Sequence, residues 1–300
     1  FSLIVKLKSE LDKFMYQKFS KSGTDIPSLG LGTWDLNEND CTRIVSEALE
    51  LGYRHIDGAS MYENESKVGK GIAASGVDRQ EIFLTTKINT LGWTPSIGNT
   101  SLLKNKNITK EFEKSLLDLN TDYVDLLLIH WPIFETNLGD MLEIMYTIKE
   151  SKKAIEIGVA NFNSSLLNEC KNLGFGDIYC NQVEYHPFLS QAKVLEVMDS
   201  LRIIPVAYCP ICRGEVAKDE VIINLAEKYS KTPAQITLRW VLQQKIVAIP
   251  KTANSLRLRE NIDIYDFDIE QEDMVKIFDL ARNQRLVPNL ESNALLYPWD

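Results

Sequence analysis

Short runs rich in valine, isoleucine and leucine recur along the chain, each bounded by glycine, proline, aspartate or asparagine. Such runs are typical of buried β-strands. Between them, apolar residues recur at helical spacing, as they do in residues 40–52, 138–151 and 220–232. We expect eight strands, over residues 27–33, 53–57, 81–87, 124–130, 154–160, 178–183, 202–207 and 246–249.

This alternation of strands and helices predicts a parallel sheet, because parallel neighbours need helix-sized crossover connections. Eight units in 300 residues predict an α/β fold, a closed (β/α)8 TIM barrel that forms one domain over residues 1–300. We expect a short N-terminal extension over about residues 1–15 and a β-hairpin before the barrel. The competing fold is an open doubly wound sheet, whose dinucleotide-binding form carries G-x-G-x-x-G after its first strand. The corresponding segment here, GLGTWDL, lacks the third glycine.

Composition and charge narrow the class of protein. Lys and Arg number 33 against 42 Asp and Glu, a net charge of −9 that disfavours a nucleic acid partner. The five cysteines are an odd number scattered along the chain, as is usual in a reducing compartment. No apolar run approaches the roughly 18 residues that span a bilayer. We therefore expect a cytoplasmic protein without a membrane segment. We also expect a monomer, although these features leave the oligomeric state open.

Ionisable side chains follow three neighbouring predicted strands, at the end where barrel enzymes place their chemistry. Asp57, Lys87 and His130 end these strands, and Tyr62 lies in the loop after Asp57. Each has an ordinary structural explanation. Asp57 could cap a helix, Lys87 could extend out of the barrel, His130 could be a hydrogen-bonded core histidine, and Tyr62 could be an ordinary loop aromatic. Together they predict a proton-transfer site.

The chemistry of these four groups suggests how they would work together. A phenol has a pKa of about 10, and an adjacent ammonium moves that pKa toward the working range. Lys87 would be this ammonium, and Asp57 would offset the unfavourable burial of its charge. We therefore expect Lys87 to lower the pKa of Tyr62.

Seven segments, in this order, resemble the aldo-keto reductase family: LGLGTW (29–34), YRHIDGASMYENE (53–65), EIFLTTK (81–87), DYVDLLLIHWP (122–132), IGVANF (157–162), NQVEYHP (181–187) and IPKTANSLRLREN (249–261). The resemblance implies reduction of carbonyl compounds by direct hydride transfer from C4 of a nicotinamide. It implies that Tyr62 is the general acid, Lys87 and Asp57 its tuning pair, and His130 the donor that orients the carbonyl. It also implies that the nicotinamide is held by Asn161, Gln182 and Tyr208.

The segment IPKTANSLRLREN predicts an anion site from its residues alone. Asn254 or Ser255 can cap a helix there, yet Lys251 precedes it and Arg257 falls in its first turn, where the helix dipole disfavours cations. A bound phosphate would remove this conflict, and a ribose 2′-phosphate would make the cofactor NADPH. The alternative is a pair of solvated surface cations. The resemblance adds contacts from Thr252, Glu260 and Asn261.

Trp34 and Trp131 are candidates for a substrate wall, because aromatic side chains beside the catalytic groups form an apolar slot.

Two residues depart from the family pattern: Gly58 replaces a common Thr, and Ala160 replaces a Ser that bonds the nicotinamide. Cys209 and Cys212 form C-x-x-C, which we interpret as coincidental, with no metal site expected.

The sequence thus predicts an NADPH-dependent reductase of aldehydes or ketones, with a small carbonyl compound as its partner. Two alternatives stay open. One is a cofactor-binding regulatory protein on the same barrel. The other is an aldolase in which Lys87 forms a Schiff base.

Overall fold

The computed structural model describes residues 18–90, 93–94, 98–99, 105–132, 137–287 and 300. Eight strands form one parallel sheet in the order β12-β11-β10-β9-β8-β5-β4-β3. The sheet curls until its two edges meet: the Gly30 amide donates to the Ala248 carbonyl, and the Ala248 amide donates to the Ser28 carbonyl, both at 2.8 Å. The predicted (β/α)8 barrel is therefore confirmed.

All eight predicted strands exist, with ends that differ from prediction by up to four residues. The largest difference is at the first strand, where only Leu31–Gly32 forms a ladder and Leu29 contributes an isolated bridge to Ala248. The strands are β3 (Leu31–Gly32), β4 (His55–Asp57), β5 (Phe83–Ile88), β8 (Val124–Ile129), β9 (Ala154–Ala160), β10 (Cys180–Glu184), β11 (Ile204–Tyr208) and β12 (Val247–Ala248).

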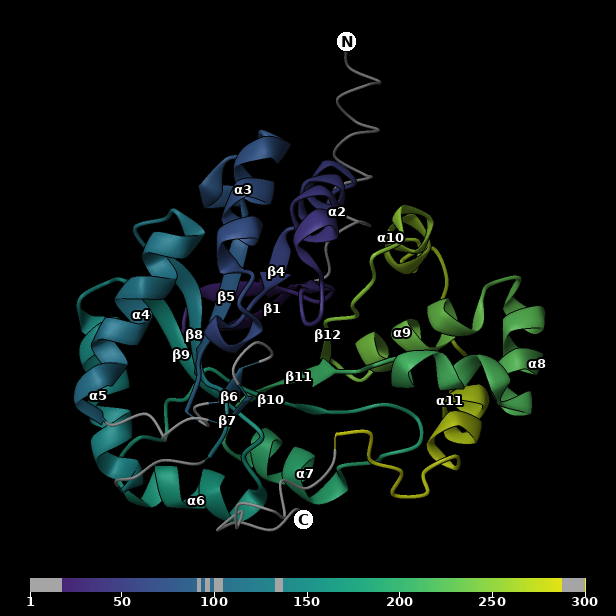
Figure 1. The fold of residues 1–300 in the computed structure, drawn as a ribbon. Coiled ribbons are helices and arrows are strands. Elements are labelled where there is room, and N and C mark those ends of the chain that lie inside the picture. Colours follow the sequence, from purple (N-terminus) through teal and green to yellow (C-terminus); the bar gives the residue numbers. More distant parts are fainter. Residues whose placement is uncertain (1–17, 91–92, 95–97, 100–104, 133–136, 288–299) are drawn as a thin grey trace, which may run out of the picture.

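Helices surround the strands (Figure 1). Their ends follow local capping chemistry: the Asn37 side chain caps α2, and Thr232 with Gln235 forms a capping box at α9. The helices are α2 (Glu38–Glu50), α3 (Glu65–Ser75), α4 (Asn105–Leu119), α5 (Leu138–Glu150), α6 (Ser164–Asn172), α7 (Ala192–Ser200), α8 (Glu220–Tyr229), α9 (Pro233–Gln243), α10 (Ser255–Ile262) and α11 (Gln271–Phe278).

A β-hairpin precedes the barrel, as predicted. Its strands β1 (Lys18–Lys21) and β2 (Thr24–Pro27) are joined by Ser22 and Gly23, both at positive φ, as tight two-residue hairpins require. Ile26 of β2 packs into the barrel interior with Phe83 and Tyr179, which lie at or near the amino ends of their strands. The hairpin therefore closes the end of the barrel opposite the strand carboxyl ends. The expected N-terminal extension lies outside the described residues.

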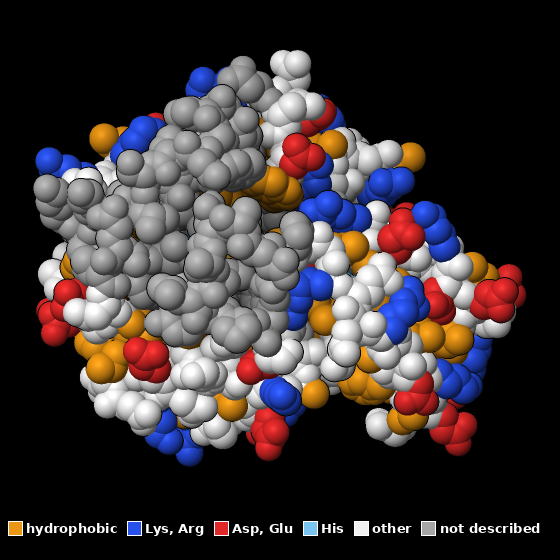
Figure 2. Space-filling view, turned by 60° about the horizontal axis from the view of Figure 1, so that its bottom comes forward, with side chains coloured by type: hydrophobic (Ala, Val, Ile, Leu, Met, Phe, Trp, Pro, Cys, Tyr) orange, Lys and Arg blue, Asp and Glu red, His pale blue; other side chains and the backbone are white. Residues whose placement is uncertain are grey.

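The core has two layers. A small cluster fills the barrel interior, and a larger one lies between the strands and the helices. Among the described residues, no helix combines the length and apolar character needed to cross a membrane. On the face in Figure 2, basic and acidic side chains are interspersed over the described surface.

Candidate active site

A buried ion pair lies at the carboxyl ends of β4 and β5. Asp57 is the last residue of β4, and Lys87 lies near the end of β5. The Lys87 ammonium, wholly inaccessible to solvent, donates to Asp57 Oδ1 at 2.5 Å and to the Gly58 carbonyl at 2.8 Å. Burial lowers the pKa of Lys87, and the Asp57 carboxylate opposes that shift. Asp57 thus holds the Lys87 ammonium in place at this end of the barrel.

Tyr62 lies against this pair on a short 3-10 turn, Ser60–Tyr62, that follows β4. Its hydroxyl is 3.3 Å from Lys87 Nζ. The turn is tied to β5, because the Ser60 hydroxyl donates to the Lys87 carbonyl at 3.0 Å. The Tyr62 ring meets the His130 ring edge-on, with centroids 5.6 Å apart. The structure therefore brings together all four residues of the predicted tetrad, Asp57, Tyr62, Lys87 and His130.

The expected lowering of the Tyr62 pKa is wrong for the protein described here. Burial raises the pKa of Tyr62 well above its ordinary value, and the Asp57 charge raises it further. The physical reason is that a buried phenolate loses its hydration, while Asp57 already neutralises Lys87. Tyr62 is therefore held in its protonated form.

His130 is held in its neutral form. Burial lowers the pKa of His130 well below its ordinary value, and the Lys87 charge acts in the same direction. Its Nδ1 is buried and makes no hydrogen bond within the described part of the chain. A neutral imidazole has one N–H to donate and one nitrogen that accepts, so this ring can donate a hydrogen bond to a ligand oxygen.

The predicted nicotinamide contacts surround the tetrad, with their polar groups already bonded to protein atoms. Gln182 Nε2 donates to Asp57 Oδ2 at 2.8 Å. Asn161 Nδ2 donates to the His130 carbonyl at 2.9 Å, and its Oδ1 accepts from the Tyr208 hydroxyl at 2.8 Å. Gln182 thus extends the Asp57–Lys87 chain, a link that sequence reasoning missed. The cofactor roles of these three residues stay predictions.

The predicted phosphate site lies at the start of α10. Asn254 caps this helix by accepting from the Leu256 and Arg257 amides, and no acidic residue occupies its first turn. Lys251 is 3.7 Å from Asp35, a carboxylate whose side chain is 81% exposed. Such an exposed pair is weak, so both Lys251 and the exposed Arg257 are suited to binding an anion.

The other predicted contacts at this end are buried or bonded within the protein. Thr252 is buried, and its hydroxyl accepts from the Asn254 amide at 3.0 Å. Glu260 accepts from the Thr232 hydroxyl at 2.6 Å, so this carboxylate also ties α10 to α9. Asn261 is buried on the same helix. The resemblance implies a phosphate contact for Thr252 and places Glu260 and Asn261 near the adenine, and these contacts stay predictions.

The two predicted substrate-wall tryptophans adjoin the tetrad. The Trp34 ring meets the Tyr62 ring edge-on at 4.9 Å between centroids, and it is 36% exposed. Trp131 is buried, and its ring stacks near the His130 ring at 6.2 Å. Their predicted contact with a substrate stays a prediction.

The departure from the family pattern at Gly58 leaves the tetrad geometry intact. Lys87 bonds to the backbone carbonyl of Gly58, which any residue there would supply, and a Cβ at this position would meet Thr85 O at an ordinary 3.5 Å. Sequence patterns give no signal for such a carbonyl ligand. A buried Thr33, whose hydroxyl donates to the Asp57 carbonyl at 2.9 Å, was also missed, although it lies in the LGLGTW segment.

Cys209 and Cys212 are free thiols at the two ends of a turn, in which the Cys212 amide donates to the Cys209 carbonyl at 2.9 Å. Burial raises the pKa of both thiols, which favours the unreactive protonated form. Within the described ranges, no group of three His, Cys, Asp or Glu side chains is arranged to hold a metal ion.

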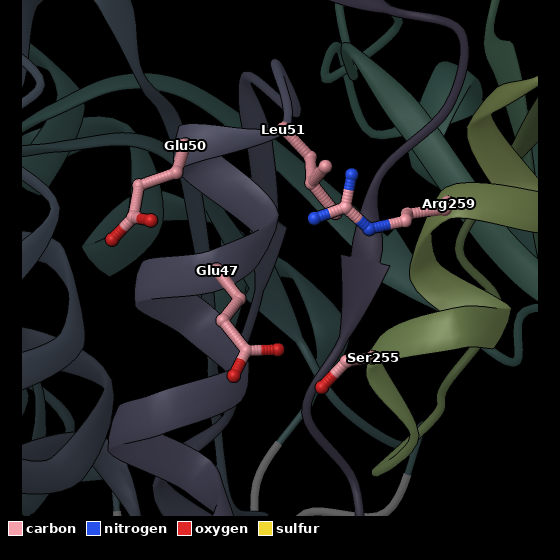
Figure 3. Close-up of a pocket in the computed structure, with 5 residues that line it drawn as sticks. All are labelled: Glu47, Glu50, Leu51, Ser255 and Arg259. Atoms are coloured by element: carbon pink, nitrogen blue, oxygen red, sulfur yellow. The ribbon is translucent and has the colours of Figure 1, made fainter.

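A groove lies between α2 and α10 (Figure 3). Its lining is mostly charged, and Arg259 extends across it from α10. None of the predicted site residues lines it. The lining residues are Glu47, Glu50, Leu51, Ser255 and Arg259.

Comparisons with known proteins agree with this fold. Glyoxal reductase from Bacillus subtilis is 39% identical over 269 residues, covering 89% of this chain and 94% of the relative. A methylglyoxal reductase from Yersinia pestis is 36% identical over 272 residues, covering 90% and 94%. A crystal structure named provisionally for 2,5-diketo-D-gluconic acid reductase B superposes with a TM-score of 0.88 at 35% identity, covering 96% of this chain and 99% of that one. The model of the Aldo/keto reductase family matches residues 28–282, and the chain belongs to that family.

Proposed function

We propose that this protein reduces small aldehydes or ketones to alcohols with NADPH, and that Tyr62 supplies the proton. The observation that supports this most directly is the Tyr62 hydroxyl 3.3 Å from Lys87 Nζ, at the barrel end where such sites lie. The relatives that act on glyoxal and methylglyoxal support reactive small carbonyl compounds as substrates.

The residues present fit a nicotinamide cofactor. Two side-chain amides and a tyrosine lie on three neighbouring strands beside the tetrad: Asn161 follows β9, Gln182 lies within β10 and Tyr208 ends β11. Lys251 and Arg257 offer two cations at a helix start without acidic neighbours in its first turn, which suits a 2′-phosphate. When bound, the cofactor supplies the hydride that reaches the carbonyl carbon.

In this mechanism each residue of the tetrad has one task. His130, neutral, donates a hydrogen bond that orients the carbonyl oxygen. Tyr62 gives its proton to that oxygen as the carbon accepts the hydride, and the phenolate that forms is stabilised by the Lys87 ammonium. Asp57 holds the ammonium in place, and Gln182 holds Asp57. Solvent then returns a proton to Tyr62.

The Schiff-base alternative finds no support in this geometry. An amine nucleophile must reach its substrate, whereas the Lys87 side chain is wholly buried and its nitrogen is surrounded by Asp57 and Tyr62. For the regulatory alternative, the discriminating measurement is turnover itself, with methylglyoxal and glyoxal as substrates and NADPH oxidation as the signal.

The direct test is Tyr62→Phe, which removes only the hydroxyl. We expect kcat for methylglyoxal reduction to fall by about 10²–10⁴-fold, the usual contribution of a positioned general acid. NADPH binding, measured by tryptophan fluorescence, should be unchanged. Tyr123→Phe is the matched control, because residue 123 precedes β8 at the opposite end of the barrel. Turnover by Tyr62→Phe at the wild-type rate would remove Tyr62 as the proton donor.

A further inference from the structure

Glu65 is a buried carboxyl group that the proposed mechanism does not use. It begins α3, three residues after Tyr62, and it is only 4% exposed. The Thr86 hydroxyl donates to its Oε1 at 2.5 Å. Thr86 immediately precedes Lys87 on β5, and neighbouring residues in a strand face opposite sides, so Thr86 faces α3 while Lys87 faces the tetrad. One hydrogen bond therefore connects the element after Tyr62 to the strand that carries Lys87.

The segment between Tyr62 and α3 is also tied to the loop that follows β3. Asn64 precedes α3 without capping it. Its side-chain amide donates instead to the Thr33 carbonyl at 2.9 Å and to the Leu36 carbonyl at 3.3 Å. Two consecutive residues thus bind the Tyr62 turn to two different parts of the barrel.

Close packing leaves α3 little room to move. A Cβ at Gly69 would lie 2.7 Å from the Leu119 carbonyl carbon of α4, and a Cβ at Gly71 would lie 2.7 Å from the Val45 Cβ of α2. The helix is therefore closely packed between α2 and α4. The Glu65–Thr86 hydrogen bond joins the start of this helix to β5.

The charge of Glu65 also acts on the tetrad. Burial raises the pKa of Glu65 to about 7, against hydrogen bonds from Thr86 and Ser115 that lower it. When ionised, Glu65 raises the pKa of Lys87 and so favours the ammonium. The charged groups that face Glu65 are Glu111, Lys114 and Asp118 of α4 and Lys87 of β5.

We propose that Glu65 is a positioning residue for the carbonyl reduction proposed above: through Thr86 it holds Lys87 at the distance from Tyr62 that proton donation requires. The role is distinct from substrate or cofactor binding, because Glu65 lies outside the barrel wall between α3, α4 and β5. It rests on the proposed function, so the test begins with wild-type turnover.

The test compares Glu65→Ala, Glu65→Gln and Thr86→Val. Removing the side chain in Glu65→Ala should lower kcat roughly 10- to 100-fold, the loss expected when reacting groups shift by about 1 Å. NADPH affinity should stay within about twofold, because no cofactor contact is lost. Glu65→Gln keeps an oxygen for Thr86 and should restore most of kcat, whereas Thr86→Val should reproduce the loss.

Thr42→Val is the matched control, because the Thr42 hydroxyl also binds α3, at the Lys67 carbonyl, without touching β5. It should leave kcat unchanged. The wild-type kcat should rise only a few-fold as pH increases through about 7, the pKa of Glu65, because the protonated carboxyl, like Gln, still offers Thr86 an oxygen. This small inflection should be absent in Glu65→Gln. Tyr62 and His130 have pKa values well above and well below this range.

Three results would overturn the proposal: wild-type kcat in Glu65→Ala, equal losses in Glu65→Gln and Glu65→Ala, or an inflection near pH 7 that persists in Glu65→Gln. A folding defect in Glu65→Ala is recognised by its thermal melting. In that case kcat of Thr86→Val, compared with that of Glu65→Gln, decides whether the Glu65–Thr86 bond positions Lys87. Absence of turnover by the wild-type protein with every carbonyl substrate would instead refute the proposed function.

Discussion

Replacing Asp57 with Asn tests whether the buried ion pair is the electrostatic centre of the site. The change keeps the shape of the side chain and removes its charge. Lys87 would retain the Gly58 carbonyl at 2.8 Å and the Tyr62 hydroxyl at 3.3 Å, but its ammonium would lose the only counterion within bonding distance among the described residues. Because both side chains are at most 2% exposed, water cannot replace the lost charge.

The expected destabilisation of Asp57→Asn is about 3–5 kcal/mol at neutral pH, the usual effect of breaking a buried pair on one side. Its pH dependence has a defined sign. Burial already lowers the folded-state pKa of Lys87 below 10.5, and Asp57 opposes that shift, so the variant lowers it further. Above the folded-state pKa the unfolded chain binds more protons, so stability rises with pH toward 10.5. The stability deficit of the variant should therefore shrink as pH rises toward 10.5.

The assay is urea denaturation followed by tryptophan fluorescence, on wild type, Asp57→Asn, Lys87→Met and the double variant. If the pair is coupled, the double variant should recover at least half of the Asp57→Asn loss, because no buried charge is left without a partner. Additive losses in the double variant, or a deficit that grows with pH, would refute the reasoning.

Two further predictions concern the cofactor site and the packing of α3. Arg257→Ala should weaken NADPH binding by roughly 10- to 100-fold and leave NADH binding unchanged, since a charge-assisted phosphate contact contributes about 1.5–3 kcal/mol. The control is Arg259→Ala, which changes a residue of the groove in Figure 3. Equal effects on the two cofactors would exclude a 2′-phosphate contact. Gly69→Ala should lower the free energy of unfolding by about 1–3 kcal/mol, because the new Cβ would press on the Leu119 backbone. The control is Gly176→Ala, whose Cβ would meet only Lys171 Cγ, at 3.9 Å, and which should leave the melting temperature unchanged. A Gly69→Ala protein as stable as wild type would show that α3 can move away from α4.

The sequence was sufficient to predict the barrel and the meeting of the tetrad, for a topological reason. Parallel strands that close into a barrel place all their carboxyl ends at one mouth, so Asp57, Lys87 and His130 had to converge once the strands were recognised. The exact ends of the strands were less predictable. At the first strand, ladder pairing is confined to Leu31–Gly32, while the preceding residues use their backbone groups to close the barrel.

Side-chain partners were the part that sequence patterns could not supply. Gln182 was expected to face a cofactor, and its amide donates to Asp57 instead, which depends on the relative height of β10 and β4 in the barrel. Glu65 ends the YRHIDGASMYENE segment, and the sequence pattern predicts no role for it. Its position suggests only an acidic first residue of a helix, and the partner Thr86 becomes visible only when α3 is packed against β5.

The incorrect expectation for the Tyr62 pKa changes how the role of Lys87 should be understood. Proximity to an ammonium is readable from the sequence, but burial is not, and burial dominates here. A phenol kept protonated is the form that a reductase needs before the reaction. In the mechanism proposed above, the carbonyl oxygen would gain negative charge as its carbon accepts the hydride, and would become a far stronger base than a phenolate. Only then would Tyr62 acquire a charge that the ammonium 3.3 Å away can stabilise. Lys87 would thus act mainly on the transition state, and an interaction that is stronger there than in the ground state is the kind that raises kcat.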